Sequence, residues 1–255
     1  MKKLFRGFCS RGFLIPFSIF IFALIIRTYK LSYIPFGFHM DEVSNTYIGR
    51  FILLNGEDIY GNKLPLLFFN KFGDFPPVLP MYFSGLATFV FGTTEFAARF
   101  PAAFFGSLII FPLYSLVQRL ISRTSAILSC LVIAILPWHV VLSRSSSEGI
   151  IALTFCTFGL MFLFAGIVEK KIFSLFSSAV FLFLTYFLYP SFRVLVPLIF
   201  LPLPFVYSEH KKIRNILLSL FCILSLLPYT VFFCTSTRCI FYSFCRHSEC
   251  YLILA

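Results

Sequence analysis

Two adjacent carboxylates stand in the string His39-Met40-Asp41-Glu42, directly after the first long apolar run of the chain. A carboxylate can act as a general base toward a hydroxyl group, so Asp41 and Glu42 are the candidate catalytic pair. A structural role is the alternative, because acidic residues favour the first turn of a helix through its free amides and its dipole. That role explains each acid singly, but ionisable groups close to hydrocarbon are costly and usually functional.

Further polar candidates for substrate binding stand at the edges of later apolar runs. Asp74 precedes Pro76-Pro77, where helix-dipole and turn chemistry would also explain an acid. Arg99 heads an apolar run, where it would bind a lipid phosphate or extend to the membrane interface. Arg144 and Glu148 flank a run of serines, for which a solvated loop with a chance ion pair is the alternative. The candidate substrate-binding residues are therefore Asp74, Arg99, Arg144, Glu148, Tyr82 and His39.

The eight cysteines do not indicate a metal centre. Four of them crowd the segment 234–255 at spacings that match no zinc motif with short paired ligands. Phenylalanine, serine, cysteine and arginine dominate this segment without a helical period. We expect an irregular Cys-rich tail there, of the kind that a shifted reading frame also produces.

The composition of the chain indicates whether its surface faces water or lipid. Of 255 residues, 59% are apolar, 20% aromatic and only 12% charged, with a mean hydropathy of +0.93. Soluble domains usually carry about 25% charged residues, and a chain of this size cannot bury so much hydrocarbon in one core. These values exclude a soluble globule, a disordered chain, a coiled coil and a nucleic-acid-binding protein. We interpret the net charge of +11 as the excess of lysine and arginine that membrane proteins carry in their cytoplasmic connections.

The apolar runs predict an all-α polytopic transmembrane bundle of about seven crossings. A helix needs about 20 apolar residues to cross the ~30 Å hydrocarbon layer. The first run has no signal-peptide cleavage site, so it reads as an uncleaved anchor. The predicted crossings are 12–33, 97–117, 125–142, 149–168, 173–189, 194–207 and 216–233.

Basic residues set the predicted orientation. Eleven of the 21 lysines and arginines lie in the amino-terminal segment and in the connections 119–123, 170–171 and 211–214. This alternation places those segments inside the cell, with the amino end cytoplasmic. We expect a multi-pass protein of the plasma (inner) membrane with its functional residues on the extracytoplasmic face.

The segment 34–95 is the predicted first outer loop of a transmembrane module that covers residues 1–233. It holds six of the ten acidic residues. Residues 41–54 have the apolar spacing of an amphipathic helix, with Asn55-Gly56 as its stop signal. A crossing at 77–91 would put the later basic loops on the wrong sides, so 77–91 is predicted to be a second interfacial helix.

An ordered set of short motifs resembles the membrane-embedded glycosyltransferases of the GT-C fold. The similarity is greatest to bacterial relatives of dolichyl-phosphate-mannose protein mannosyltransferases and of lipid A aminoarabinose transferases, and it covers residues 13–148. The motifs are Ile34-Pro35, His39-Met40-Asp41-Glu42, Tyr47, Gly56, Tyr60-Gly61, Pro65, Asp74-Phe75-Pro76-Pro77, Tyr82, Phe91-Gly92, Ala98-Arg99, Pro101, Pro137-Trp138 and Ser143-Arg144.

The resemblance implies transfer of a monosaccharide from a polyprenyl-phosphate carrier to a protein, lipid or glycan acceptor outside the membrane. On matching positions, Asp41 orients or deprotonates the acceptor hydroxyl and Glu42 supports it. Asp74 matches an acidic position near the carrier phosphate, Arg99 matches the basic residue at the head of the second crossing, and Glu148 matches an acid of the second outer loop. Phe75 departs from the lysine of aminoarabinose transferases, and family chains continue beyond residue 255, so a truncated member is expected.

The implied chemistry needs no nucleotide-binding loop and no certain cofactor, because polyprenyl phosphate is already a good leaving group. A divalent metal would neutralise the phosphate, but oxygen ligands alone do not establish one. Two other readings stay open. One is a truncated, inactive module that binds lipid or a partner subunit. The other is a transporter, which would place ionisable residues and broken helices at mid-membrane, often with an internal repeat.

Overall fold

The computed structural model describes residues 11–61, 63, 65 and 76–200, and every regular element in these ranges is a helix. The prediction of an all-α chain is confirmed for them. The chain divides into two units, Met1–Phe192 and Arg193–Ala255. The elements in chain order are α2 (Arg11–Thr28), α3 (Met40–Asn55), α4 (Leu79–Phe91), α5 (Glu95–Leu108), α6 (Ile110–Leu120), α7 (Arg123–Ile135), α8 (Pro137–Arg144), α9 (Glu148–Glu169), α10 (Ile172–Thr185) and α11 (Phe192–Phe200).

Two helical stretches are long and apolar enough to cross a bilayer. They are Glu95–Leu120, which joins α5 and α6 over 26 residues, and the 22 residues of α9. The bent pair α7 and α8 would make a third, whereas α2, α4 and α10 contain shorter apolar stretches. The described residues thus hold two or three such spans, fewer than the seven predicted. The predicted crossing 216–233, most of 194–207 and the tail 234–255 lie outside the described residues.

Helix α2 ends at Thr28, five residues before the boundary expected from hydropathy. Lys30 follows in the left-handed conformation with φ 49°, which an α-helix does not accommodate. The last carbonyls of a helix lack intrahelical partners. Here Arg144 donates to two of them, those of Ile26 and Arg27, at 2.7 and 3.1 Å, and also to the carbonyl of Tyr29, just past the helix, at 2.7 Å.

The expected crossing 125–142 is two helices, α7 and α8, bent by 54° where Pro137 follows Leu136. Proline has no N–H, so the carbonyl four residues earlier loses its helical partner. The buried guanidinium of Arg27 replaces it, because Nη2 donates to the Ile133 carbonyl and Nη1 to the Ala134 carbonyl, each at 3.0 Å. Pro137 and the hydrogen bonds of Arg27 therefore fix the angle between α7 and α8.

Helices α3 and α4 form a tightly packed pair within the predicted first outer loop. A Cβ built on Gly49 would lie 1.9 Å from the carbonyl oxygen of Met81, and one on Gly85 would lie 2.5 Å from the Gly49 backbone. Arg50 also reaches across to donate to Thr88 Oγ1 at 2.9 Å. At 13 residues, α4 is about 20 Å long, shorter than the ~30 Å hydrocarbon layer.

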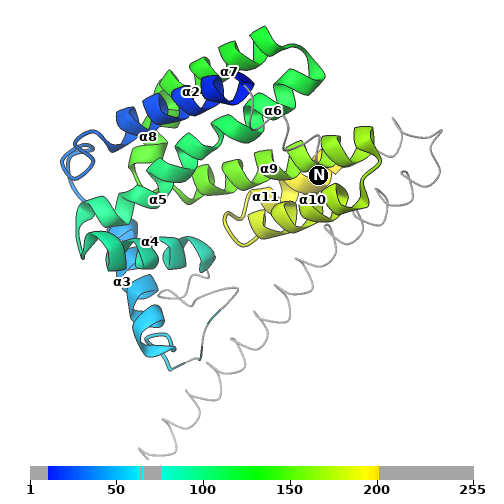
Figure 1. Cartoon of the computed structure of the whole chain (residues 1–255). Coiled ribbons are helices and arrows are strands. Elements are labelled where there is room, and N and C mark those ends of the chain that lie inside the picture. Colours follow the sequence, from blue (N-terminus) through cyan, green and yellow to red (C-terminus); the bar gives the residue numbers. More distant parts are fainter. Residues whose placement is uncertain (1–10, 62, 64, 66–75, 201–255) are drawn as a thin grey trace, which may run out of the picture. The chain divides into compact units, whose positions relative to one another are not determined.

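The ends of the first unit's helices fall into two groups. Arg119 of α6 donates to Glu169 of α9 at 3.1 Å, which brings the α6–α7 and α9–α10 connections together at one end. The start of α3, the α8–α9 connection and the segment after α10 meet at another place, around a pocket described below. Figure 1 shows α5 and α9 lying between these two ends.

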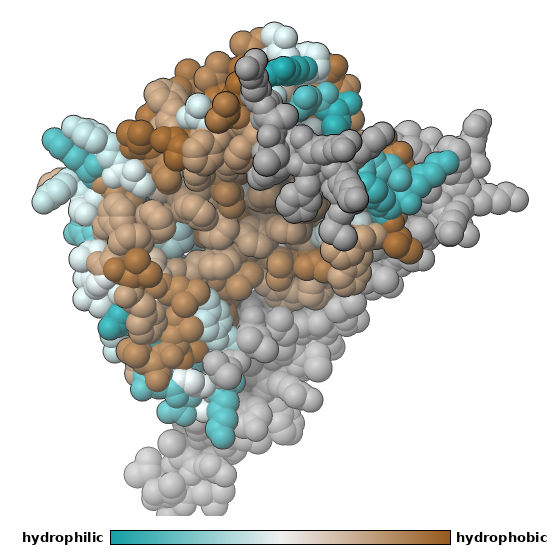
Figure 2. All heavy atoms as spheres, in the orientation of Figure 1, coloured by the Kyte–Doolittle hydropathy of each residue, from teal (hydrophilic) through white to brown (hydrophobic). Residues whose placement is uncertain are grey.

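Apolar side chains occupy both the interior and the surface of the first unit. One buried cluster joins α2, α6 and α7 through residues such as Ala23, Ile110 and Cys130. Outside, hydrophobic residues cover much of the face drawn in Figure 2. Exposed leucines and isoleucines occur on α2 and α7, among other helices. A helical surface of this kind is expected of a protein whose solvent is largely lipid.

Candidate active site

The first turn of α3 is held by a reciprocal cap that involves both candidate acids. The backbone N–H of Asp41 donates to His39 Nδ1 at 3.2 Å, and Glu42 Oε2 accepts from the backbone N–H of His39 at 3.3 Å. In this cap His39 Nδ1 acts as the hydrogen-bond acceptor. Gly56 closes the helix at φ 73°, so the predicted stop at Asn55-Gly56 is confirmed.

Asp41 and Glu42 lie in different environments although they are adjacent. The Asp41 side chain is 65% exposed, with an oxygen 3.5 Å from His39 Nδ1. The Glu42 side chain is only 4% exposed and forms an ion pair with Arg99, in which Nη2 lies 3.0 Å from Oε2. Successive residues of a helix point about 100° apart, and this difference directs one carboxylate outward and the other inward.

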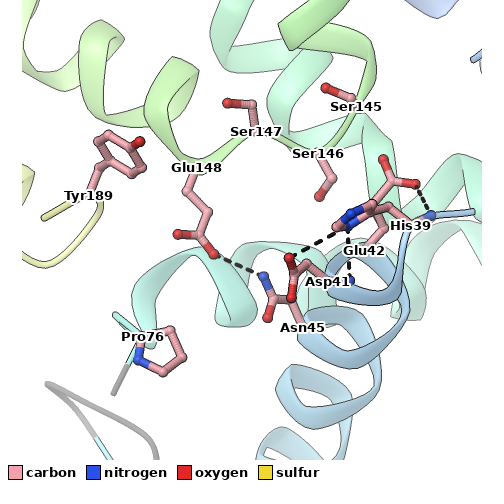
Figure 3. A pocket seen from close by; sticks show the side chains of 10 residues that line it. All are labelled: His39, Asp41, Glu42, Asn45, Pro76, Ser145, Ser146, Ser147, Glu148 and Tyr189. Atoms are coloured by element: carbon pink, nitrogen blue, oxygen red, sulfur yellow. Dashed lines mark hydrogen bonds and ion pairs between the residues drawn. The ribbon is translucent and has the colours of Figure 1, made fainter. Parts of the chain in front are cut away.

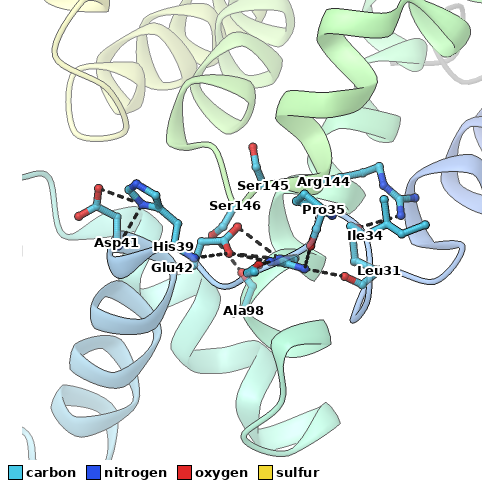
Figure 4. Close-up of polar contacts among 12 residues, drawn as sticks. Leu31, Ile34, Pro35, His39, Asp41, Glu42, Ala98, Arg144, Ser145 and Ser146 are labelled. Carbon is cyan, nitrogen blue, oxygen red and sulfur yellow. Dashed lines mark hydrogen bonds and ion pairs between the residues drawn. The ribbon is translucent and has the colours of Figure 1, made fainter.

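The guanidinium of Arg99 is completely buried, and all five of its N–H groups have acceptors. Nε and one Nη2 proton reach Glu42. Nη1 donates to the carbonyls of Leu31 and Pro35 at 3.0 and 3.1 Å, and Nη2 also donates to the carbonyl of Gly37. The contacts of this cluster can be followed in Figure 4. An arginine has five donors, so a phosphate contact would require one of these bonds to break.

A pocket of about 430 Å³ opens beside the start of α3. Figure 3 shows Asp41 and Asn45 on one side of it, the three serines and Glu148 on another, and Tyr189 farther away. The volume suits one or two sugar rings and is within the range of small-molecule sites. The residues that line it are His39, Asp41, Glu42, Asn45, Pro76, Ser145, Ser146, Ser147, Glu148 and Tyr189.

A hydrogen bond joins the two walls of the pocket. Asn45 Nδ2 donates to Glu148 Oε1 at 2.9 Å, from α3 to the first residue of α9. The serine connection is shaped by Ser146, which adopts φ 53° and donates from Oγ to the Ala98 carbonyl at 3.0 Å. Glu148 is consequently held over Asn45 with its carboxylate facing the pocket (Figure 3).

The structure brings three of the sequence-derived candidates into the pocket with Asp41, namely His39, Glu42 and Glu148. Arg99 and Arg144 lie behind it and bind backbone carbonyls. Tyr82 is elsewhere on α4, where its hydroxyl donates to the Pro65 carbonyl at 2.9 Å, and burial raises its pKa above the ordinary value. Asp74 lies outside the described residues.

Sequence reasoning missed Asn45, the three serines as pocket residues, Pro76 and Tyr189. Asn45 stands four residues after Asp41, and this spacing places both on one helix face, so the signal was present. The serines had been noted only as a run between two charges. Tyr189 reaches the pocket through the packing of α10 on α9, and no local pattern indicates that contact.

Metal binding gains no support from the ranges that the structure describes. Within them, no group of three histidine, cysteine, aspartate or glutamate side chains is placed to hold a metal ion. The pocket lining offers carboxylate, amide, imidazole and hydroxyl groups.

The comparison with known families decides which class of protein carries this pocket. The family model for dolichyl-phosphate-mannose-protein mannosyltransferase matches residues 74–233, which is more than half of the chain. The chain belongs to this family. Its resemblance to GT-C glycosyltransferases is thereby confirmed, and membership indicates a membrane glycosyltransferase. A search of the curated proteins finds no significant match.

The matched region contains one wall of the pocket. Glu148, the serines, Tyr189 and the buried Arg99 fall within residues 74–233, whereas His39, Asp41 and Asn45 precede them.

Proposed function

We propose that this chain transfers a monosaccharide from a polyprenyl-phosphate carrier to a hydroxyl group of a protein, lipid or glycan acceptor. Asp41 is the catalytic carboxylate. The observation that carries this proposal is the exposed carboxylate of Asp41 in a sugar-sized pocket, beside a Glu42 whose charge is already paired with Arg99.

The reaction we propose is a single displacement at the anomeric carbon. The acceptor oxygen forms a bond to that carbon while the bond from the carbon to the phosphate oxygen breaks. The bonding electrons leave with polyprenyl phosphate, and the proton of the acceptor hydroxyl moves to a carboxylate oxygen of Asp41. Attack opposite to the leaving group inverts the anomeric configuration. General-base assistance of this kind contributes typically ~10²- to 10⁴-fold.

Glu42 and Arg99 act as positioning residues in this proposal. Their buried ion pair ties the first turn of α3 to α5 and to the loop that precedes it, which fixes the place from which Asp41 acts. A site must hold its groups close to the productive geometry, and locked neighbours achieve this. Contact of Arg99 with a lipid phosphate, which its place at the head of an apolar run suggested, would cost at least one of its present hydrogen bonds.

Glu148 and Asn45 bind the sugar in this proposal. Carboxylate and amide groups suit sugar hydroxyls, and a bound sugar would compete with the hydrogen bond that now joins these two side chains. Asp74 precedes the pocket residue Pro76 by two positions. We propose that it lies near the phosphate of the carrier.

The proposed orientation places the pocket outside the plasma membrane and the amino end in the cytoplasm. Support comes from the pairing of Arg119 with Glu169, which gathers two basic connections at one end of the helices. The pocket is built from connections that alternate with these along the chain. Basic connections favour the cytoplasmic side.

The test is a transfer assay with the purified chain in nanodiscs and a defined polyprenyl-phosphate sugar. We expect release of polyprenyl phosphate that depends on a hydroxyl acceptor, and a product of inverted anomeric configuration. A product of retained configuration would contradict the single displacement. Donor binding without turnover would favour an inactive lipid-binding module, and sugar movement without bond cleavage would favour a transporter.

A further inference from the structure

The segment between α2 and α3, residues 29–38, exposes an unusual set of side chains. Tyr33 is 75% exposed and Phe36 is fully exposed, and Tyr29 and Ile34 also lie largely open. Lys30 is the single charged residue in this segment, and its amine lies over the ring of Tyr29 at 5.6 Å. Aromatic rings with one lysine beside them are the composition found where a protein meets the membrane–water interface.

The backbone of this segment is satisfied from inside the protein. Two buried arginines, Arg99 and Arg144, donate to five of its carbonyls, although the segment is not helical. The acceptors are Tyr29 and Ile34 for Arg144, and Leu31, Pro35 and Gly37 for Arg99. A loop in water needs no such protein partners, because water molecules can donate hydrogen bonds to its carbonyls at little cost. In hydrocarbon each unsatisfied carbonyl costs several kcal/mol, so non-helical backbone requires internal partners.

The position of residues 29–38 in the chain also supports a location at the membrane. The segment follows α2, an apolar helix, without any intervening polar turn. The end of α2 is itself bound by Arg144, the last residue of α8, so the segment starts from a backbone that is tied to the helix bundle. Immediately after it come His39 and Asp41 of the pocket.

We propose that residues 29–38 form a rigid wedge that inserts into the outer leaflet of the lipid bilayer. Tyr29, Tyr33, Ile34 and Phe36 enter the interface, and Lys30 meets the lipid phosphates. The wedge sets the depth of the pocket at the headgroup layer. It rests on the membrane placement of α2 and is independent of whether the pocket transfers sugar.

Tryptophan fluorescence in liposomes tests the wedge, because the chain has a single tryptophan, Trp138. In a Trp138→Phe background, Phe36→Trp adds a reporter at a side chain that is fully exposed, so folding is not at risk. Thr93→Trp, in the exposed turn between α4 and α5, is the matched control. The liposomes contain phosphatidylcholine brominated near the headgroup and no polyprenyl phosphate, so that quenching reports the bilayer alone.

We expect Phe36→Trp to emit at shorter wavelength than Thr93→Trp, to be quenched severalfold by the brominated lipid and to be protected from aqueous iodide. Equal accessibility of both reporters to iodide, without lipid quenching at Phe36, would overturn the wedge. Equal lipid quenching at both positions would also overturn it, because the whole outer face would then lie in lipid. Neither result depends on transferase activity.

Discussion

The carboxylate of Glu42 lies 3.0 Å from Nη2 of Arg99, with both side chains buried and 57 residues apart in the sequence. This ion pair gives the two adjacent acids of α3 different environments. Glu42 supports the fold, and its neighbour Asp41 is left facing the pocket. Substitution of Glu42 should therefore lower mainly the stability of the protein, and substitution of Asp41 should lower mainly its activity.

Removal of one partner from the buried pair should be costly. Glu42→Gln leaves the Arg99 guanidinium buried without a counter-charge, which destabilises a protein by about 3–5 kcal/mol. Thermal unfolding in detergent should show a large loss. Arg99→Lys should also destabilise, because one ammonium cannot reach Glu42 and three carbonyls together. A Glu42→Gln variant as stable as the unmutated chain would contradict the pairing.

The hydrogen bond between Asn45 and Glu148 predicts a pH-dependent variant. Asn45→Asp places a second carboxylate where the amide now donates to Glu148 at 2.9 Å. Two such carboxylates repel each other until one takes up a proton, which restores the hydrogen bond. The unfolding temperature of Asn45→Asp in detergent should therefore be lowered at neutral pH, relative to the unmutated chain, and should recover as the pH falls. The unmutated chain, measured in parallel, should not recover in this way.

The close approach of α3 and α4 predicts a stability difference between two Gly→Ala variants. In Gly49→Ala the new Cβ would meet the Met81 carbonyl at 1.9 Å, and separating the helices should cost about 1–3 kcal/mol or more. The control is Gly149→Ala, whose Cβ would find its nearest neighbour at 3.6 Å. Gly149 lies in the first turn of α9, where alanine also fits and restricts the unfolded chain more than glycine does, so this control should be neutral or slightly stabilising in thermal unfolding.

Membrane orientation can be checked by cysteine labelling in intact cells. Thr93→Cys in the α4–α5 turn should react with an impermeant maleimide, whereas Ile121→Cys, exposed between α6 and α7, should react only after permeabilisation. Labelling is compared with the unmutated chain, to subtract its own cysteines. The reverse pattern would invert the proposed topology.

Local signals in the sequence were sufficient for the elements that carry the site. The capped start of α3, its stop at Gly56 and the span of α9 follow from residues within a few positions of each boundary. The early end of α2 does not, because Arg144 binds its last carbonyls from 117 or more residues away. The bend before Pro137 likewise depends on Arg27.

The role of Arg99 shows why the site itself was only partly predictable. A cation at the head of an apolar run suggests a phosphate ligand, and no sequence pattern reveals that its acceptors are three backbone carbonyls and Glu42. Backbone acceptors belong to every residue type, so they leave no trace in composition or spacing. Tyr189 was missed for a related reason, since its place depends on how α10 packs against α9.

The most direct test of the account is the rate of sugar transfer by Asp41→Asn, compared with the unmutated chain and with Glu57→Gln. The Glu57 variant removes a carboxylate from the same outer loop but outside the pocket, and it should keep its activity. Asp41→Asn preserves size and most hydrogen bonding, yet it cannot accept the acceptor's proton. Its rate should fall by about 10²- to 10⁴-fold with unfolding temperature unchanged. Near-full activity in Asp41→Asn would contradict the central claim.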